Sequence, residues 1–568
     1  MNASKLIFVI IYMMSFLFCG NKLIGYVYDI NRNPIKNANI YIDDKRYSET
    51  DELGMFEVNF SDINSILKVS YVGFESYEVV LRNFSDSEIV LNMSDLNSDN
   101  VVVTATRYYR HIKETPVLVH IITSEDIKNG SFSTVKEMME VALPNVQMVA
   151  SNHGNDRVKI QGLDNKYTVF LVDGDRVSGE NAGNIDFSLF DLENVKRMEI
   201  VEGGMSVLYG SGAIGGVVNI ITNKQDKPGW FNVSYFNDNP LFHSTSIQSG
   251  FKKSRLYYNI NYINKGSDGY DLTPQTPFSK TLEKNWSDSW KHNLIYDFSR
   301  YSSLEFDYNI YKSDTEKYNQ IFSMETFDYI TILDSPLSGY NGKTYKVKFS
   351  KEFMNNSSFK VSFLNEKYTK DYYYPYYYSN SNYNINGETF NQGILEHSEF
   401  QLQYNYETKM HTRLIGLDYI YDTYSAYNIY NLNGELLHES IFGGNNSSKK
   451  RYDYSFFLLN QATLPNDNKL ALGVRFLNDD KTIGSISYLI KRKSGYNIRT
   501  SFSSGYRQPS LKELYYEWVD HEPHIYGNPN LEPTTNKNIS ISFDKRTDIN
   551  DFSIDLYSNN IDNMISTE

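Results

Sequence analysis

The chain has 568 residues and a formal net charge of −14, with 55 lysines and arginines against 69 aspartates and glutamates. This length exceeds one ordinary compact domain, and an acidic balance without a basic cluster argues against a nucleic-acid partner. The mean hydropathy is −0.49, yet aromatic residues make up 15% of the chain, a composition typical of a transmembrane β-barrel, with a soluble tyrosine-rich β protein as the alternative.

The first segment, residues 1–20, is predicted to be a secretory signal. Lys5 precedes an apolar run from Leu6 to Phe18, which is short for a spanning helix and suits a signal core. Cys19 is the only cysteine and follows a poor lipidation box, so lipidation and loss with the signal both stay open. Since no later run has the apolar length of a transmembrane helix, we expect any membrane spanning to be by strands.

Residues 23–93 are predicted to form a separate β-rich module. Apolar strand-like runs alternate with turn chemistry, of which Asn31 to Pro34 is the clearest case. The order of these segments resembles the carboxypeptidase-regulatory-like domain, which implies a small β-sandwich serving as a periplasmic spacer or docking domain. Asn33 and Asn37 stand where that family often has glycine, and asparagine tolerates the left-handed backbone region.

A polar linker follows, and the predicted linker region as a whole covers residues 94–107. Within it lies a short valine-rich segment that favours an extended backbone. It is either the first strand of the next domain or a segment that a partner captures by adding it to a sheet edge. The segment comprises Val101, Val102, Val103, Thr104, Ala105 and Thr106.

Residues 108–227 combine helix and strand signals, which predicts an α+β domain. Helices are expected from Ser124 and over residues 134–143, where Pro144 ends the second one. A glycine-rich stretch at 197–223 contains G-x-G-x-x-G spacing, but a β-branched run follows it instead of the helix that a dinucleotide site needs. Small residues in this pattern allow close backbone packing and tight turns.

Three motifs in this region, at 158–163, 169–177 and 197–223, together resemble the plug domain of TonB-dependent outer-membrane receptors. The resemblance implies that the valine-rich segment is a TonB box. We expect residues 94–106 to be mobile without ligand, so that the energy-transducing partner can capture the box. Gln161 stands where the family commonly has arginine, and Arg157 and Arg197 are the nearest candidates to replace that arginine in a plug–barrel contact. The plug-motif candidates are Arg197, Glu199, Gly203, Tyr209, Gly210, Gly215, Gly216 and Asn219.

Residues 228–568 alternate apolar and polar residues with a period of two, which predicts an antiparallel transmembrane β-barrel with a polar lumen. The pattern is clear where Leu304 and Phe306 flank Glu305. The fold class is therefore mainly β: a small β-sandwich, an α+β plug and a barrel. Since receptors of this family close with more strands than 340 or so residues can supply, we expect the barrel to be incomplete at the C-terminus.

No pattern of catalytic residues is present, and the chain is not expected to be an enzyme or to carry a resident cofactor. Motifs at 506–515 and 526–533 resemble a pair found in the barrels of these receptors. In haem receptors of this class a histidine between these motifs and another on the plug bind haem iron, which makes His153 with His521 or His524 a candidate pair. Tyr374 and Tyr376, in a tyrosine-rich loop, are further ligand candidates, with a girdle role as the alternative.

The resemblance implies a TonB-dependent receptor in the cell outer membrane that takes up a scarce extracellular ligand. The ligand class would be an iron–siderophore complex, haem or cobalamin. The expected partners are this ligand, the inner-membrane TonB complex and outer-membrane lipid, with no nucleic acid. The alternatives are a passive channel, and a surface binding or adhesion protein that uses the same barrel.

Overall fold

The chain divides into two compact units, which are described separately: Met1–Val101 with Phe353–Ser357, and Val102–Glu352 with Ser358–Glu568. The structure is a computed structural model. It describes residues 21–566 except 30–31, 44, 61, 72–73, 75, 85–87, 92–100, 108–109, 131, 133–134, 143–145, 150–156, 178–191, 226, 239–241, 273–282, 300, 317, 324–326, 334–336, 354–355, 375–387, 409, 431–433, 435, 441, 444–446, 479, 493–494, 519–524 and 547–550. Over these described residues, no helix combines the length and the apolar character needed to cross a bilayer.

The N-terminal unit is a β-sandwich, as the sequence predicted. One sheet has the order β4-β1-β7 and the other β3-β2-β5-β6. Apolar side chains from both sheets form its core, and Asn37 takes the left-handed conformation with φ +63° at a turn. The strands are β1 (Asn21–Tyr28), β2 (Asn39–Ile42), β3 (Lys45–Glu49), β4 (Met55–Phe60), β5 (Ile66–Ser70), β6 (Tyr77–Val80) and β7 (Glu88–Val90).

The second unit begins with an α+β domain, which we call the plug. Its central sheet has the order β10-β16-β17-β14-β15, and two smaller sheets pair β8 with β9 and β11 with β12 and β13. The helices α2 (Ser124–Gly130) and α3 (Val135–Ala142) lie where the sequence predicted them. The other elements are β8 (Val101–Val102), β9 (Arg110–His111), β10 (Val119–Thr123), β11 (Val146–Val149), β12 (Arg157–Ile160), β13 (Leu163–Asp164), β14 (Thr168–Val172), β15 (Asp175–Arg176), β16 (Val195–Glu202), α4 (Ser206–Tyr209) and β17 (Gly216–Thr222).

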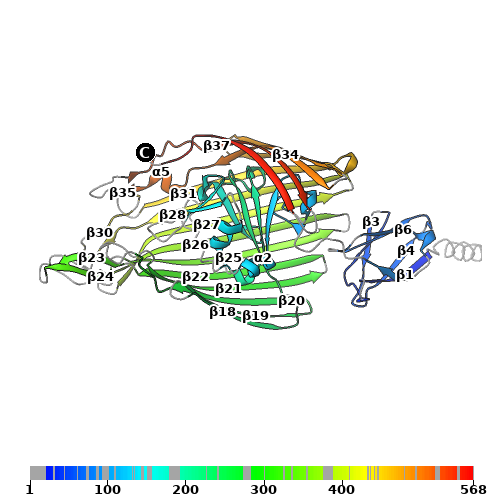
Figure 1. The fold of residues 1–568 in the computed structure, drawn as a ribbon, viewed down its shortest axis with the longest axis horizontal. Helices are drawn as coiled ribbons and strands as arrows, with labels where there is room; N and C mark the ends of the chain where they lie inside the picture. The colour runs from blue at the N-terminus through cyan, green and yellow to red at the C-terminus, as the bar shows by residue number, and fades with distance from the viewer. Residues whose placement is uncertain are drawn as a thin grey trace, which may run out of the picture. The chain divides into compact units, whose positions relative to one another are not determined.

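The rest of the unit is one antiparallel sheet of 15 strands, the barrel sheet, which Figure 1 shows as long arrows with the plug lying against them. Among the described residues β18 lies at one edge and β38 at the other; the incomplete barrel stays a prediction. Its strands in order are β18 (Trp230–Asp238), β19 (Phe242–Lys253), β20 (Leu256–Ser267), β21 (Lys284–Ser299), β22 (Ser302–Glu316), β25 (Leu337–Phe353), β26 (Ser357–Tyr374), β27 (Glu388–Glu407), β28 (His411–Ala426), β31 (Ser447–Thr463), β32 (Lys469–Leu477), β33 (Thr482–Lys491), β34 (Tyr496–Arg507), β37 (Thr534–Arg546) and β38 (Asp551–Asp562).

Several connections between barrel strands carry secondary structure of their own. The sequence between β22 and β25 forms a hairpin, and so does the sequence between β28 and β31. The connection from β34 to β37 holds a short helix, α5 (Leu511–Tyr515), whose first turn Ser510 and Glu513 close as a capping box. The hairpin strands are β23 (Tyr318–Ser323), β24 (Asp328–Leu333), β29 (Ile429–Tyr430), β30 (Leu436–His438), β35 (Glu517–Trp518) and β36 (Ile525–Tyr526).

The alternation read from the sequence sets which face of each barrel strand is buried. Phe306 of β22 is 39% exposed and pairs with Val347 of β25, whereas its neighbour Glu305 is 6% exposed and pairs with Lys348. Because successive side chains point to opposite faces, one face carries apolar cross-strand pairs and the other carries ion pairs. The polar face is the one that contacts the plug, since Glu305 also binds Lys224 at 2.8 Å.

Candidate functional site at the plug–barrel contact

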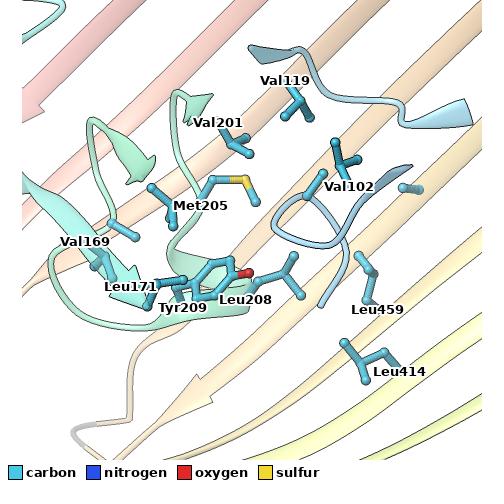
Figure 2. Packing of buried hydrophobic residues seen from close by; sticks show 14 of the residues in the cluster. Val102, Val119, Val169, Leu171, Val201, Met205, Leu208, Tyr209, Leu414 and Leu459 are labelled. Atoms are coloured by element: carbon cyan, nitrogen blue, oxygen red, sulfur yellow. The ribbon is translucent and has the colours of Figure 1, made fainter. Parts of the chain in front are cut away.

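Residues 102–106 of the valine-rich segment lie inside the plug–barrel contact. Val102 and Thr104 are 0% exposed and Ala105 is 5% exposed. Figure 2 shows Val102 near plug residue Val119, and both belong to one apolar cluster with barrel residue Leu459. The expected mobility is therefore wrong for residues 102–106 in this structure, because they are packed as part of the plug.

Polar contacts hold the same segment through one carboxylate. Glu199 accepts hydrogen bonds from the main-chain nitrogens of Val103 (2.9 Å) and Thr104 (2.8 Å), and from Oγ1 of Thr104 (2.6 Å). Glu199 is 0% exposed, and its other oxygen contacts Nη2 of Arg197 at 2.6 Å. A buried carboxylate is tolerated only when it is paired and hydrogen-bonded, and Glu199 satisfies both conditions.

Two further plug-motif residues complete the shell around Thr104. Nδ2 of Asn219 donates to Oγ1 of Thr104 at 3.0 Å, and the hydroxyl of Tyr209 donates to its main-chain oxygen at 2.8 Å. Arg197 and Glu199 lie on one face of β16 because they are two residues apart on a strand. Three predicted motif residues thus contact Thr104 of the 101–106 segment, and a fourth, Arg197, pairs with the carboxylate that holds it.

The predicted motif glycines lie where the backbone conformation or close packing disfavours other residues. Gly216 has a φ of +145°, and a Cβ there would lie 2.4 Å from the main-chain oxygen of Val201. Gly203 (φ +89°) and Gly210 (φ +73°) also take conformations that disfavour other residues, and Gly210 is the C-cap of α4. Gly215 donates its N–H to Tyr167 at 2.7 Å, so β17 lies close to that part of the plug.

Barrel arginines anchor the plug, and the sequence analysis did not single them out. Arg475 of β32 is 1% exposed and donates to the main-chain oxygens of Val207 (2.8 Å) and Leu208 (2.7 Å). It also pairs with Asp418 of β28 at 2.7 Å. Plug residue Arg107, directly after the 101–106 segment, reaches the same carboxylate at 3.5 Å.

Gln161, the residue in place of the common arginine, makes its own contacts. Its amide nitrogen donates to Glu202 at 2.7 Å, and its oxygen accepts from Asn559 of β38 at 3.4 Å. Arg197 does not replace the missing arginine at the barrel, because it pairs with Glu199 inside the plug; that part of the prediction is wrong. The side chain of Arg157, the other candidate, lies outside the described residues.

A cavity of about 220 Å³ separates another part of the plug from strands β20 to β26. Beside it Lys346 bridges Asp175 of the plug (2.5 Å) and Asp307 of β22 (2.8 Å). Burial raises the pKa of Asp175, but the charges of Lys346 and Lys348 outweigh burial and hold it below its ordinary value. The plug is therefore attached to the barrel by ionised pairs on this side also.

The ligand candidates from the sequence fall into two groups. Tyr374 is 2% exposed and packs edge-on against Phe390 with ring centroids 5.8 Å apart, so ligand contact would require this cluster to open. The remaining candidates, His153, His521, His524 and Tyr376, lie outside the described residues. Within the part of the chain that the structure describes, no group of three or more His, Cys, Asp or Glu side chains could hold a metal ion.

Comparison with protein families gives three matches along the chain. Residues 23–103 match the CarboxypepD_reg-like domain, residues 111–217 the TonB-dependent receptor plug domain, and residues 215–568 the TonB dependent receptor-like β-barrel. The last match alone covers more than half of the chain.

Individual relatives also match this chain, at low sequence identity or over a small part of it. The chain is 24% identical to the vitamin B12 transporter BtuB of Photobacterium profundum over 84% of this chain and 72% of that protein. It is 35% identical to an iron-regulated outer membrane virulence protein of Vibrio cholerae, over only 23% of this chain and 21% of that protein.

Solved structures share the fold. A ferric enterobactin receptor mutant (PfeA) of Pseudomonas aeruginosa superposes with a TM-score of 0.64 at 17% identity, over 81% of this chain and 73% of that chain. The pyoverdine-bound FpvA of P. aeruginosa gives 0.61 at 13% identity, over 84% and 69%. At these identities the structures establish the fold alone.

Proposed function

Since this chain belongs to the family of TonB-dependent outer-membrane receptors, we propose that it takes up a scarce extracellular solute using energy delivered through residues 101–106. The family assignment confirms the resemblance read from the sequence. The family is one of receptors and transporters, and we propose that the chain has no enzymatic activity. We further propose that the N-terminal β-sandwich is a periplasmic spacer or docking module.

The observation that carries this proposal is the state of the main chain at residues 103–104. A partner that adds this segment to a sheet edge must use its main-chain N–H groups. Those of Val103 and Thr104 are bound by Glu199 in this structure, at 2.9 and 2.8 Å. Binding to Glu199 and capture by TonB are therefore mutually exclusive, so the segment can act as a switch.

The contacts around Thr104 suggest how the switch is held. Hydrogen bonds to charged groups contribute about 1.5–3 kcal/mol each, so three such bonds to Glu199 hold the segment firmly without ligand. Arg107 and Arg475 share Asp418, which ties the segment's end and α4 to the same barrel strand. Movement of the plug on ligand binding would weaken both sets of contacts together.

We propose an iron–siderophore complex, haem or cobalamin as the transported solute. The names of the relatives support this range, since they include a vitamin B12 transporter and receptors for ferric enterobactin and pyoverdine. Ligation of haem by His153 with His521 or His524 stays a prediction. A passive channel or an adhesion protein would use the same barrel without needing the switch.

Deletion of residues 101–106 tests the proposal. We expect the deletion to abolish energised uptake into cells while the purified receptor still binds solute. Because residues 102 and 104–106 are buried, thermal unfolding of the purified receptor must show that the plug stays folded without them. A matched control is Val101→Ala, which keeps the main chain that capture uses. Equal uptake after the deletion would favour a passive channel, and binding without uptake by the intact chain would favour adhesion.

A further inference from the structure

The end of β34 holds the plug through main-chain hydrogen bonds. The N–H of Tyr506 donates to Oγ of Ser206 at 3.2 Å, and its main-chain oxygen accepts from the N–H of Gly212 at 3.0 Å. Just after the strand, the N–H of Gln508 donates to Oγ of Ser211 at 3.0 Å. Ser206 is the first residue of α4, and the other two partners follow its C-cap. The barrel therefore holds α4 at both ends, and a shift of this main chain would change all three contacts.

Arg507, between these two residues, joins the plug to α5. Its Nε donates to the main-chain oxygen of Lys166 at 3.0 Å, and its Nη2 donates to the two carboxylate oxygens of Glu513 at 3.0 and 2.8 Å. Glu513 also accepts from the N–H of Ser510 at 2.8 Å, within the capping box that begins α5. Nζ of Lys166 lies 3.5 Å from the same carboxylate. One carboxylate thus serves the first turn of α5 and two cations beside the plug.

The other side of α5 packs against distant barrel strands. Leu511 is buried in a cluster with side chains of β26, β27 and β28, namely Tyr368, Leu395 and Tyr424. In the barrel sheet β31, β32 and β33 lie between β28 and β34, so α5 folds away from its own strand, and Figure 1 shows it beside β31. A cavity of about 140 Å³ separates the start of α5 from the plug turn at 211–212. The start of α5 therefore stands off the plug, and the polar contacts of Arg507 bridge the gap.

The connection that carries α5 lies at the extracellular end of the barrel. It runs from the end of β34 at Arg507 to the start of β37 at Thr534, whereas β33 ends at Lys491 and β34 begins already at Tyr496. In barrels of this class the short turns are periplasmic and the long connections are extracellular. A solute that approaches the plug from outside therefore meets α5 on this side of the barrel.

Helix α4 connects this attachment to the 101–106 segment. It has only four residues, so Ser206 at its start and Tyr209 at its end belong to one helical turn. Ser206 is held by Tyr506, and the hydroxyl of Tyr209 donates to the main-chain oxygen of Thr104 at 2.8 Å. A shift at the first contact therefore displaces the group that makes the second.

We propose that residues 506–513, the clasp, couple the extracellular end of the barrel to the 101–106 segment. Displacement of α5 by an entering solute breaks the pair between Arg507 and Glu513, loosens α4 and lets Thr104 leave the plug. The inference rests on the proposed function and adds how release of the segment is controlled.

Burial gives the clasp two discrete states. Arg507 is 3% exposed, and a buried guanidinium that loses its carboxylate is strongly destabilised. When α5 carries Glu513 away, Arg507 must therefore leave the oxygen of Lys166 and follow the carboxylate or reach water. Since Tyr506 and Gln508 flank Arg507 in sequence, its departure shifts the main chain that holds α4.

Hydrogen exchange on the intact purified receptor without solute tests this coupling at the amides of Val103 and Thr104. Glu513→Gln removes the charge of the carboxylate but keeps a residue type that can complete the capping box. Arg507→Gln removes the other half of the pair, and the double variant completes a mutant cycle. Exchange over α3 is recorded in the same samples, because its buried residues belong to a different apolar cluster of the plug.

We expect each glutamine variant to speed exchange at residues 103–104 about tenfold or more, since either change leaves a buried charge without its partner or removes the contact that positions it. The double variant should exceed the larger single effect little, because both changes remove one contact. Exchange over α3 should keep its wild-type rate. Glu532→Gln is the matched control and should change nothing, because this exposed carboxylate of the same connection contacts Asn563 at 3.0 Å instead of the plug.

Three results would overturn the inference: unchanged exchange at residues 103–104 in the glutamine variants, additive effects in the double variant, or an equal rise over α3, which would mean general loosening of the plug. Glu513→Gln lies outside the barrel strands, so it decides the first and third points even if Arg507→Gln fails to fold. None of these results bears on energy coupling, which the deletion of residues 101–106 tests through uptake. A receptor that requires this segment for uptake but shows unchanged exchange would keep its proposed function and lose only the clasp.

Discussion

Replacement of Thr104 by valine should release the 101–106 segment from the plug. The change keeps the shape of the side chain and the main-chain N–H, but removes the hydroxyl. That hydroxyl donates to Glu199 at 2.6 Å and accepts from Asn219 at 3.0 Å, and all three residues are 0% exposed. The substitution therefore removes two buried hydrogen bonds without opening a large cavity.

The expected magnitude follows from these two contacts. A hydrogen bond to a charged acceptor contributes about 1.5–3 kcal/mol, and an unsatisfied buried donor on Asn219 costs about 1–3 kcal/mol. The two effects share one atom and are not additive, so we expect a net loss of about 2–4 kcal/mol. Since about 1.4 kcal/mol is a factor of ten, local opening should rise about 30- to 700-fold.

Hydrogen exchange on the intact receptor without ligand measures this opening at the amides of Val103 and Thr104. Thr115→Val is the matched control, because Thr115 is also 0% exposed but its hydroxyl donates to Ile112 O at 2.7 Å, away from Glu199. The control should leave protection at residues 103–104 unchanged. If Thr104→Val altered protection there by less than about threefold, the hydrogen bonds to Glu199 would not be what holds the segment.

Two further predictions concern Gly216 in the plug and the Arg507–Glu513 ion pair at α5. Gly216→Ala should destabilise the plug by about 1–3 kcal/mol or more, because an alanine there would have a strained φ and its Cβ would clash with the main-chain oxygen of Val201. Gly174→Ala is the control, since Gly174 has a φ of +85° but nothing within 4 Å of the added Cβ, and it should lower the stability less in the same thermal unfolding measurements. Burial raises the pKa of Glu513, but the charge of Arg507 outweighs burial and holds the pKa below its ordinary value of 4.5. The contribution of this ion pair to the stability of α5 is therefore complete above pH 4.5 and is lost as the pH falls through the lowered pKa. Exchange protection of α5 should thus be equal at about pH 7 and about pH 5.5 and fall only below about pH 4, and Glu513→Gln should remove that acid step; a loss already at about pH 5.5 would contradict the lowered pKa.

Much of the fold could be predicted because its signals are local and repeated. Alternation around Glu305 fixes which face of β22 is polar, and turn chemistry at Asn37 fixes a turn of the β-sandwich. These signals depend only on neighbouring residues and on the period of a strand. The pairing of β22 with β25 was not predicted, because alternation of this kind is common to barrel strands and does not select a partner.

The site was harder to predict because its contacts join distant parts of the chain. Thr104 and Glu199 are 95 residues apart, and Arg475 reaches α4 across 268 residues. Composition predicted an extended backbone for residues 101–106, but only Val101–Val102 forms a strand and residues 104–107 form a turn. Composition also carries no information on what covers these residues. A lumen-facing arginine on a barrel strand also has the same local pattern as any other polar residue in the alternation.

The plug motif nevertheless contained part of the answer. Its members Glu199, Tyr209 and Asn219 contact Thr104, and Arg197 pairs with Glu199. The glycines between them allow β16 and β17 to approach closely. Such a motif is thus better understood as a holder for the segment that precedes it than as a feature of the plug alone. Such a motif must hold the 101–106 segment firmly without ligand and release it when the plug moves. Hydrogen bonds centred on one buried carboxylate meet both requirements, because a small displacement of β16 would weaken all of them at once.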